Sequence, residues 1–183
     1  MKHIRLFLSD IDGCLTDGGM YYSDKGDEMK RFNVYDGMGM VMLMKQGIKC
    51  GILTSEKTPI ALNRARKLGL DYLYMGVGRQ KDKETVIRHS PASAEAMTLP
   101  FCTKLDACRQ ICRELNIGLD EVCYIGDDIN DIDLLQQAGI AACPANAVEQ
   151  VKQIKGIIQL TRNGGDGAIR ELTEHLLQEE KLS

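Results

Sequence analysis

The sequence lacks the features that mark several common classes of protein. Among its 183 residues no apolar run approaches membrane-spanning length, so we expect no membrane partner. No basic stripe is present and the net charge is −3, which argues against nucleic acid as a partner. The seven cysteines form no C-x-x-C pair, so zinc is not expected, and reduced thiols fit a cytoplasmic location. Apolar residues begin almost at once, which predicts no signal peptide.

The composition is that of a globular protein. Hydrophobic residues make up 44% of the chain and charged residues 27%. The length predicts one domain over residues 1–183, large enough for a real core. Strand-like apolar runs, expected at 6–9, 48–53, 71–77 and 122–125, alternate with segments of helical period. This alternation predicts an α/β fold with a doubly wound, mostly parallel sheet.

The first of these runs ends in two carboxylates. Asp10 follows the apolar strand, and Asp12 lies two residues later, directly before Gly13. A buried strand brings Asp10 to the carboxyl edge of the sheet, where α/β folds bind ligands, and Asp12 shares that side of the turn. Two acids so close resist ionising together unless a cation lies between them. The pair alone leaves open a simpler alternative, a turn with solvated carboxylates.

Polar residues also follow two later strands. Thr54 ends the second strand, and Asp127 follows the fourth. Because parallel strands end at the same edge of a sheet, we expect Asp10, Thr54 and Asp127 to converge. A hydroxyl at this edge can donate to a phosphoryl oxygen, or it can cap the following helix. Lys104 opens an amphipathic helix that leads to the fourth strand.

Three stretches depart from the regular alternation. Residues 20–33 hold two short β-prone runs around a Gly-bearing turn, which predicts a hairpin. Residues 78–103 lack clean periodicity, so we expect an irregular insertion there, with a short helix near residues 83–89. The glycine-rich run 163–168 has two interpretations, an anion cradle or a flexible entry to the last helix.

The motifs DxDGxLTDG, LTSEKT, GDDxxD and NGGDGAIRE resemble those of the haloacid dehalogenase-like phosphatases, and the resemblance covers nearly the whole chain. It implies a Rossmann-like core with a β-hairpin flap and no cap domain. It also implies Mg²⁺ as the cofactor and an aspartyl-phosphate intermediate. In the capless branch a neighbouring subunit covers each site, so a homotetramer is expected.

The resemblance assigns roles to the residues at the sheet edge. Asp10 would be the nucleophile, and Asp12 would be the general acid and base. Thr54 and Lys104 would bind the phosphoryl oxygens. Two further groups complete the assignment: the Mg²⁺ ligands Asp10, the Asp12 carbonyl and Asp127, and the supporting acids Asp128 and Asp131.

Contacts to the rest of the substrate are implied by the same resemblance. The expected residues are Asn33, Asp36, Gly37, Ser55, Glu56, Arg64 and Lys67. For Asn33 and Asp36, which stand at a helix entrance, capping of that helix is an equally good interpretation.

The full motif set is similar to that of the ulosonate phosphatases, whose substrates are small sugar-acid phosphates. One branch acts on 3-deoxy-D-manno-octulosonate 8-phosphate, and another on the 9-phosphates of 2-keto-3-deoxynononate and N-acylneuraminate. The eight-carbon branch usually has arginines at the position of Glu56 and near Val41, and both are absent here. Glu56 with Lys67 resembles the nine-carbon branch, which we favour. Asp166 stands where the capless branch often has an arginine.

Two functions of other classes use similar residues. A receiver domain also has a phosphorylatable aspartate, but it lacks an acid two residues beyond it, so Asp12 favours hydrolysis. A catalytically idle assembly domain is disfavoured because the set of acids is complete.

Overall fold

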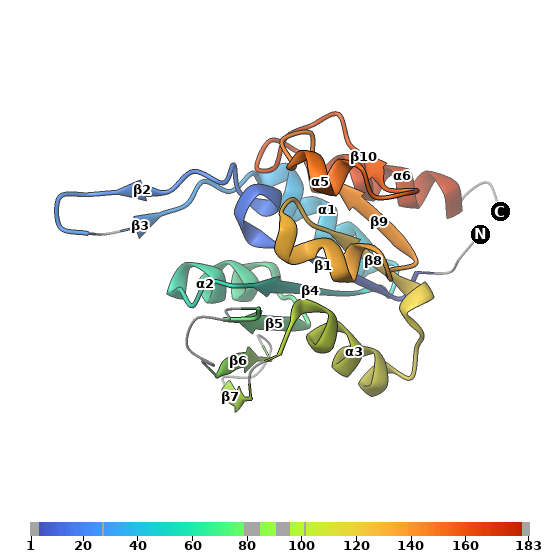
Figure 1. Cartoon of the computed structure of the whole chain (residues 1–183), viewed down its shortest axis with the longest axis horizontal. Helices are drawn as coiled ribbons and strands as arrows, with labels where there is room; N and C mark the ends of the chain where they lie inside the picture. The colour runs from blue at the N-terminus through green and yellow to red at the C-terminus, as the bar shows by residue number, and fades with distance from the viewer. Residues whose placement is uncertain (1–3, 27, 79–84, 91–95, 101, 181–183) are drawn as a thin grey trace.

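A central sheet with helices on both faces forms the body of the molecule (Figure 1). The computed structural model describes residues 4–26, 28–78, 85–90, 96–100 and 102–180. Its main strands are β1 (Leu6–Ser9), β4 (Lys49–Thr54), β5 (Tyr72–Met75), β6 (Val86–His89), β7 (Ala96–Leu99), β8 (Val122–Ile125), β9 (Ile140–Cys143) and β10 (Ile158–Gln159). In the described residues these eight strands follow the order β10–β9–β8–β1–β4–β5–β6–β7.

The six strands from β10 to β5 are parallel, which confirms the predicted doubly wound, mostly parallel sheet. β1 lies between β4 and β8 and is buried along its whole length, as its apolar sequence predicts. Ser9 is level with Ile52 of β4 and with Ile125 of β8. Asp10, Thr54 and Asp127 therefore lie one or two residues beyond this level, at one edge of the sheet.

Two layers of helices bury the two faces of the sheet. One layer holds α1 (Val34–Lys45), α2 (Pro59–Leu68) and α6 (Ala168–Glu180), and the other holds α3 (Lys104–Leu115), α4 (Ile132–Leu135) and α5 (Glu149–Lys152). Alternate residues of β1 enter the two cores, Phe7 the first and Leu6 and Leu8 the second. Burial of such side chains, worth about 25 cal/mol per Å² of apolar surface, is the main stabilising term of the fold.

The helix before β8 begins with a complete set of capping bonds. Thr103 Oγ1 accepts from the Asp106 N–H at 3.1 Å, and Asp106 Oδ2 accepts from the Thr103 N–H at 3.1 Å. These bonds satisfy N–H groups that the first helical turn would otherwise leave unpaired. They place Lys104 in the first turn of α3, while Cys108 and Cys112 lie in the core as predicted.

The segment 78–103 differs from expectation where it is described. Val86–His89 forms β6, not a short helix, and β6 and β7 extend the sheet as an antiparallel pair beside β5. The β-branched Val86 and Ile87 fit a pleated strand, and the edge of β5 offers backbone groups that a helix would leave unpaired. Lys81 and Lys83 lie outside the described residues.

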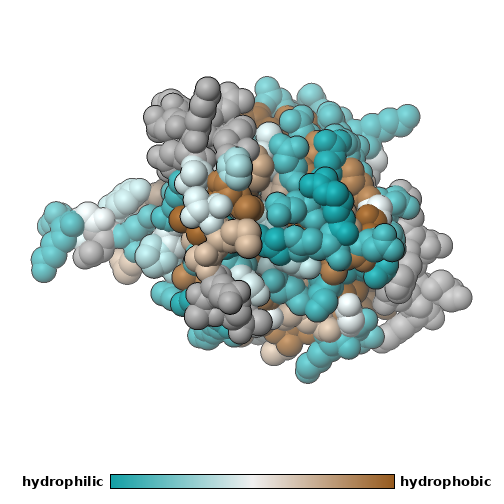
Figure 2. Space-filling model, turned by 90° about the horizontal axis from the view of Figure 1, so that it is seen from below, coloured by the Kyte–Doolittle hydropathy of each residue, from teal (hydrophilic) through white to brown (hydrophobic). Residues whose placement is uncertain are grey.

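A hairpin of β2 (Tyr21–Tyr22) and β3 (Glu28–Met29) projects from the body of the molecule, as predicted (Figure 1). Figure 2 shows the same projection with hydrophilic residues at its tip. An antiparallel bridge between Thr16 and Phe32 closes the base of the hairpin. Across the described residues, no helix is both long enough and apolar enough to cross a bilayer.

Three short helical turns complete the part of the chain that the structure describes. They are η1 (Ile11–Leu15), η2 (Leu119–Glu121) and η3 (Ile129–Asp131). η1 follows β1 and η3 follows β8, so both lie at the edge where the predicted site residues converge.

Candidate active site

A pocket of about 180 Å³ opens at the carboxyl edge of β1, β4 and β8. Its lining residues are Asp10, Asp12, Thr54, Ser55, Glu56, Asp127, Asp128 and Asn130. The pocket thus gathers seven of the residues that the sequence analysis singled out, from three segments far apart in the chain. Asn130 is the one lining residue that the sequence analysis missed.

The turn after β1 holds Asp10 at the floor of the pocket. Asp10 is 6% exposed, and its Oδ1 accepts from the Ile11 N–H at 2.7 Å. Gly13 adopts φ +84°, and a Cβ atom there would lie 1.9 Å from Asp127 Oδ2. Only glycine allows both this backbone conformation and this approach. The glycine of the D-x-D-G motif therefore lets the β1 turn reach the β8 turn.

Lys104 lies behind the two turns. Its Nζ is 3.0 Å from Asp10 Oδ2 and 2.6 Å from Asp131 Oδ1, and its side chain is 1% exposed. Burial alone would lower the pKa of Lys104, but the charges of Asp10 and Asp131 outweigh burial and raise it. Lys104 is therefore a permanent buried cation beside the predicted nucleophile.

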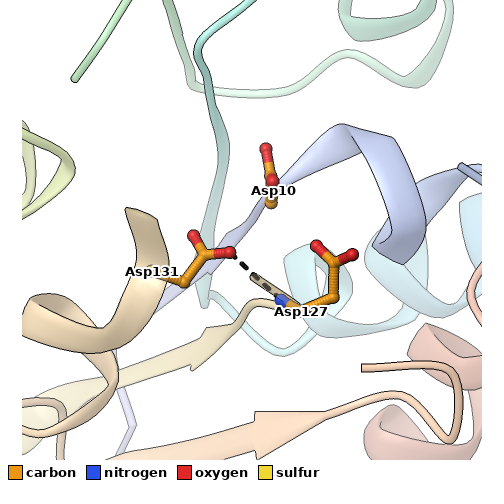
Figure 3. Close-up of side chains that lie close together, drawn as sticks. All are labelled: Asp10, Asp127 and Asp131. Atoms are coloured by element: carbon orange, nitrogen blue, oxygen red, sulfur yellow. Dashed lines mark hydrogen bonds between the residues drawn. The ribbon is translucent and has the colours of Figure 1, made fainter. Parts of the chain in front are cut away.

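Asp131 is fully engaged by the protein itself. Its carboxylate accepts from Lys104 Nζ, from the Tyr124 hydroxyl, and from the N–H groups of Asp127 and Asp128 at 3.1 and 3.2 Å. Figure 3 shows Asp131 turned toward the Asp127 backbone, while the Asp127 carboxylate points away from it. Four donors from the protein occupy this carboxylate, and its supporting role stays a prediction. The sequence analysis missed Tyr124, because the sequence of an apolar strand does not show that a tyrosine hydroxyl will meet a buried carboxylate.

Asp128 also has a local structural task. Its Oδ1 accepts from the Ile129 N–H at 2.7 Å and so caps η3. It also lines the pocket.

Asp10 and Asp127 crowd negative charge into a buried space. Carboxylate oxygens of Asp10, Asp127 and Asp131 all lie within 4.8 Å of one another. Burial raises the pKa of Asp10 to about 7, since the Asp131 charge adds to burial and Lys104 offsets only part of both. Burial also raises the pKa of Asp127 to about 8, with the charges of Asp10 and Asp131 as further causes.

The donor set of this cluster fits a hard divalent cation. Mg²⁺ prefers a few carboxylate or carbonyl oxygens and keeps several waters. Asp131 is already saturated, whereas Asp127 has the Cys14 thiol, at 3.7 Å, as its side-chain donor among the described residues. Asp10, Asp127 and the backbone carbonyl of Asp12 are the groups that could hold such an ion. A cation there would lower both raised pKa values, because it favours the ionised carboxylates.

Asp12 lies on the side of the pocket nearest the hairpin. Its Oδ1 accepts from Lys30 Nζ at 2.6 Å and, weakly, from Thr16 Oγ1 at 3.5 Å. Lys30 follows β3 directly and was missed by the sequence analysis. The signal that could have revealed it is the predicted hairpin, because its second strand must return past the turn that carries Asp12.

The β4 turn supplies the polar side of the pocket. Thr54 is 1% exposed, and its Oγ1 accepts from the Glu56 N–H at 3.1 Å. Ser55 Oγ accepts from Asn130 Nδ2 at 3.1 Å, which links the β4 turn to the β8 turn. The cap of α2 is Thr58, not Thr54 or Ser55, because Thr58 Oγ1 accepts from the Ile60 N–H.

Three predicted substrate residues at the start of α1 lie outside the pocket. Asn33 caps α1, and its Oδ1 accepts from the Tyr35 N–H at 2.8 Å. The buried Asp36 carboxylate accepts from the N–H groups of Gly167 and Arg170, which ties α1 to α6. A Cβ at Gly37 would meet the Arg64 guanidinium at 2.6 Å. Capping of α1, the alternative left open for both residues, describes Asn33 within one chain, whereas Asp36 instead accepts from amides at the start of α6.

Arg64 and Lys67 of α2 also lie outside the pocket of their own chain. The Arg64 guanidinium stacks 4.9 Å from the Phe32 ring and donates to the Asn33 carbonyl at 3.0 Å. Lys67 is exposed, about 12 Å along the helix axis from Pro59 at 1.5 Å per residue. α2 runs away from the site, so one chain does not bring these cations to Glu56.

The glycine-rich run packs against the turn after β1 and does not form an open anion cradle. The Gly164 N–H donates to Asn146 Oδ1 at 2.6 Å, and the Gly165 N–H donates to the Cys14 carbonyl at 3.1 Å. A Cβ at Gly164 would lie 1.8 Å from the Gly13 carbonyl oxygen. Its glycines therefore allow two backbone segments to approach closely. This is a third interpretation, which the sequence analysis did not consider.

Comparison with known proteins gives consistent results. A family model described as haloacid dehalogenase-like hydrolase matches residues 78–172. The chain is 31% identical over 188 aligned positions to the 3-deoxy-D-manno-octulosonate 8-phosphate phosphatase KdsC of Yersinia pestis, covering 98% of this chain and 83% of that protein. It is 29% identical over 178 positions to the KdsC protein of Haemophilus influenzae, covering 97% and 85% of the two chains.

Solved structures agree. The 3-deoxy-D-manno-octulosonate 8-phosphate phosphatase of Moraxella catarrhalis, crystallised with magnesium, phosphate and KDO, matches with a TM-score of 0.79 and 32% identity, over 97% of this chain and 87% of that one. A protein of Xanthomonas campestris described as hypothetical matches with a TM-score of 0.81 and 30% identity, over 98% and 85%.

Proposed function

Because the chain belongs to the haloacid dehalogenase-like hydrolases, in their capless ulosonate phosphatase branch, we propose that this phosphoric monoester hydrolase removes the terminal phosphate of an ulosonate. The observation that carries the proposal is the cluster of Asp10, Lys104 and Asp127 at the ends of β1 and β8. Its first candidate substrate is 3-deoxy-D-manno-octulosonate 8-phosphate, the ester named for the relatives in Yersinia, Haemophilus and Moraxella.

Asp10 and Asp12 divide the chemistry of the two half-reactions. A carboxylate oxygen of Asp10 attacks phosphorus, and the bond from phosphorus to the sugar oxygen breaks. Asp12 gives its proton to that leaving oxygen, so the sugar departs as an alcohol. Asp12 then takes a proton from water as the water oxygen attacks the phosphorus of the aspartyl-phosphate. Phosphate leaves, and both carboxyl groups return to their starting states.

Residues around Asp10 stabilise the charge of the transferring group. Lys104 contacts Asp10 Oδ2 and supplies a buried positive charge beside the phosphoryl oxygens. Thr54, at the end of β4, presents its hydroxyl to the same pocket. Asp10, the Asp12 carbonyl and Asp127 would hold Mg²⁺, which would neutralise phosphoryl charge. Such an ion would add to the positive charge of Lys104, which offsets only part of the effects that raise the pKa values of Asp10 and Asp127.

A second candidate substrate is a nine-carbon ulosonate, 2-keto-3-deoxynononate 9-phosphate or N-acylneuraminate 9-phosphate. The observation that favours it is Glu56, which lines the pocket at the rim where the sugar must enter. A carboxylate at this point accepts hydrogen bonds from sugar hydroxyls and repels a substrate carboxylate held too near. In a nine-carbon substrate the carboxylate lies farther from the phosphate than in an eight-carbon substrate, and therefore farther from Glu56.

A homotetramer is part of the proposal, because one chain leaves the site incomplete. The pocket opens beside the hairpin, whose Tyr21, Tyr22 and Met29 are exposed large side chains. Arg64 and Lys67 lie on α2, outside the pocket of their own chain, so a neighbouring copy would have to present such cations to the sugar acid. All seven cysteines are free thiols, which supports the cytoplasm as the location.

A turnover panel tests the function. Purified protein is assayed for phosphate release from the eight-carbon and nine-carbon esters and from simple sugar phosphates, with Mg²⁺ and after chelation. We expect kcat/KM to be highest for one of the two ulosonate esters and to vanish on chelation. Preference for a simple sugar phosphate over both would contradict the proposal, and light scattering at assay concentration tests the tetramer.

A further inference from the structure

A second buried lysine, Lys30, contacts the proposed catalytic acid Asp12 from the hairpin side. Lys30 Nζ lies 2.6 Å from Asp12 Oδ1 and 3.1 Å from Glu28 Oε1. The exposed fraction of the Lys30 side chain is 0%, so the remaining exposure of this residue belongs to its backbone. Burial alone would lower the pKa of Lys30, but the bonds and charges of Asp12 and Glu28 outweigh burial and raise it. Lys30 is therefore a charged ammonium group enclosed between two carboxylates.

Two residues of the hairpin segment, Glu28 and Arg31, hold the Lys30 ammonium group in place. Glu28 belongs to β3, and Lys30 follows the strand directly, so both side chains leave the same face of the ribbon. Arg31 points the other way and donates to Asp17 Oδ2 at 2.9 Å and to Asp166 Oδ1 at 2.8 Å. The Arg31 bonds join the base of the hairpin to the glycine-rich run and so hold Lys30 over the Asp12 turn.

Asp12 has little else to hold it. Its side chain is 30% exposed, and its other contact, Thr16 Oγ1 at 3.5 Å, is at the limit of a hydrogen bond. Among the described residues, both contacts of this carboxylate fall on Oδ1, so Oδ2 is available to meet the ester. A carboxyl group that turns freely loses the alignment on which proton transfer depends.

We propose that Lys30 is a positioning residue that orients the Asp12 carboxyl group toward the leaving oxygen, with Glu28 holding Lys30 in place. The inference deepens the proposed function, because it rests on Asp12 taking part in phosphoryl transfer. Lys30 contacts neither phosphorus nor Asp10. Its effect therefore reaches the reaction only through the proton that Asp12 gives to the sugar oxygen and later takes from water.

This role predicts a dependence on the leaving group. A sugar alkoxide is a poor leaving group and needs the Asp12 proton, whereas p-nitrophenolate leaves without one. Lys30→Met should lower kcat/KM for the sugar phosphate at least about a hundredfold, and for p-nitrophenyl phosphate by less than about threefold. A purely structural or phosphate-binding role would lower both values alike.

Two matched variants separate orientation from placement of the hairpin. Lys25→Met removes an exposed lysine at the hairpin tip and should leave both esters unaffected. Arg31→Met removes the bonds to Asp17 and Asp166 but leaves the Lys30 contacts, so its loss on the sugar ester should be smaller than that of Lys30→Met. An equal or larger loss in Arg31→Met would assign the effect to the hairpin as a whole.

A double-mutant cycle gives the decisive result. In an Asp12→Asn background, adding Lys30→Met should change the sugar-ester rate by less than about twofold, because the group through which Lys30 acts is absent. A further large loss, or equal losses on the two esters in the single variant, would overturn the proposal. If Lys30→Met melts early, Lys30→Gln takes its place in the same cycle.

The proposed function can fail separately. It fails if wild-type protein hydrolyses neither ulosonate ester. The Lys30 comparison needs only one sugar phosphate and one aryl phosphate that the wild-type protein turns over.

Discussion

The two halves of the active site use the same device in very different surroundings. At the edge of the sheet, Lys104 of α3 lies between the carboxylates of Asp10 and Asp131, at 3.0 and 2.6 Å. At the hairpin, Lys30 lies between those of Asp12 and Glu28, at 2.6 and 3.1 Å. Each lysine side chain is almost fully buried. Each therefore holds one of the two aspartates of the D-x-D motif.

The difference lies in what positions each lysine. Lys104 belongs to a helix of three turns whose Leu105, Cys108 and Ile111 are packed in the core. Lys30 follows the two-residue strand β3, and Met29 of β3 and Tyr22 of β2 are 62% and 63% exposed. Apolar packing holds the nucleophile half of the site, whereas polar contacts such as those of Arg31 hold the acid half. The nucleophile half should be rigid, and the acid half should respond to salt and to a neighbouring subunit.

The largest effect is expected in the nucleophile half. Asp10→Asn removes the attacking oxygen and should lower phosphate release on the order of a millionfold, as loss of a nucleophile does in other covalent catalysts. The control Asp133→Asn makes the same chemical change at an exposed position of α4 and should keep full activity. Activity in Asp10→Asn above a hundredth of wild type would assign the nucleophile elsewhere.

The acid half should fail in a way that depends on the substrate. Asp12→Asn should lower turnover of a sugar phosphate by about a hundred- to ten-thousand-fold, because the leaving oxygen receives no proton. With p-nitrophenyl phosphate the first step still proceeds, but no base activates water for the second. Rapid mixing should therefore show a burst of about one equivalent of nitrophenol and then a stall. Steady release without a burst would contradict the two roles of Asp12.

Loss of the core lysine should affect both activity and stability. Lys104→Met should lower turnover by about a hundred- to thousandfold. It also leaves two buried carboxylates unpaired, which costs roughly 3–5 kcal/mol of unfolding free energy. Added Mg²⁺ should restore part of that loss by binding to the folded state, which thermal melts will report. Lys83→Met is the control, because Lys83 lies in the segment 78–103 that precedes α3. Full activity in Lys104→Met together with a loss in Lys83→Met would show that Lys104 is not the phosphate lysine.

A smaller effect is expected at the rim. Glu56→Arg replaces an acceptor of sugar hydroxyls by a cation, so the ratio of kcat/KM between the nine-carbon and eight-carbon esters should fall at least about tenfold. The ratio is measured for wild type and for Glu56→Arg, and the two proteins should have the same melting temperature. An unchanged ratio would show that Glu56 does not determine which substrate is preferred. A wild-type preference for the eight-carbon ester would identify that ester as the substrate and exclude the nine-carbon candidate.

The smallest effect concerns the support of Lys104. Asp106→Ala breaks the capping bonds of α3 and should lower stability by about 1 kcal/mol, or about 2–4 °C in melting temperature for a domain of this size. Turnover should stay close to wild type, because core packing still holds α3. Arg113→Ala, an exposed change later in the same helix, is the control. A large loss of activity in Asp106→Ala would mean that the cap, and not the core, positions Lys104.

Sequence reasoning anticipated the nucleophile half better than the acid half. Asp10, Thr54 and Asp127 each end or follow an apolar run, and parallel strands bring such ends together whatever lies between them. Lys104 could be placed because its helix has a clear apolar stripe. Lys30 could not, because its partner Asp12 is 18 residues away and the contact depends on how a short ribbon folds back.

The predicted substrate residues also differ in whether local sequence could place them. Ser55 and Glu56 follow β4 directly and line the pocket. Asn33, Asp36 and Gly37 stand at the start of a helix, where a polar side chain can serve the backbone or a ligand equally well. The buried Asp36 shows why the two cannot be told apart in sequence: its partners are amides of α6, more than a hundred residues away.

By itself, the sequence determined the parallel sheet, the order of its elements and the edge at which the carboxylates meet. These follow from local patterns, since the period of apolar residues and the polar residue that ends each run are properties of short segments. Only the tertiary structure decided which carboxylates remain available for a cation, because Asp131 is saturated by Lys104 of α3 together with donors of β8 and its turn. It also decided that Lys30 reaches Asp12. Hydrogen bonds and ion pairs between distant segments have no period in sequence, and their geometry exists only once the cores have packed.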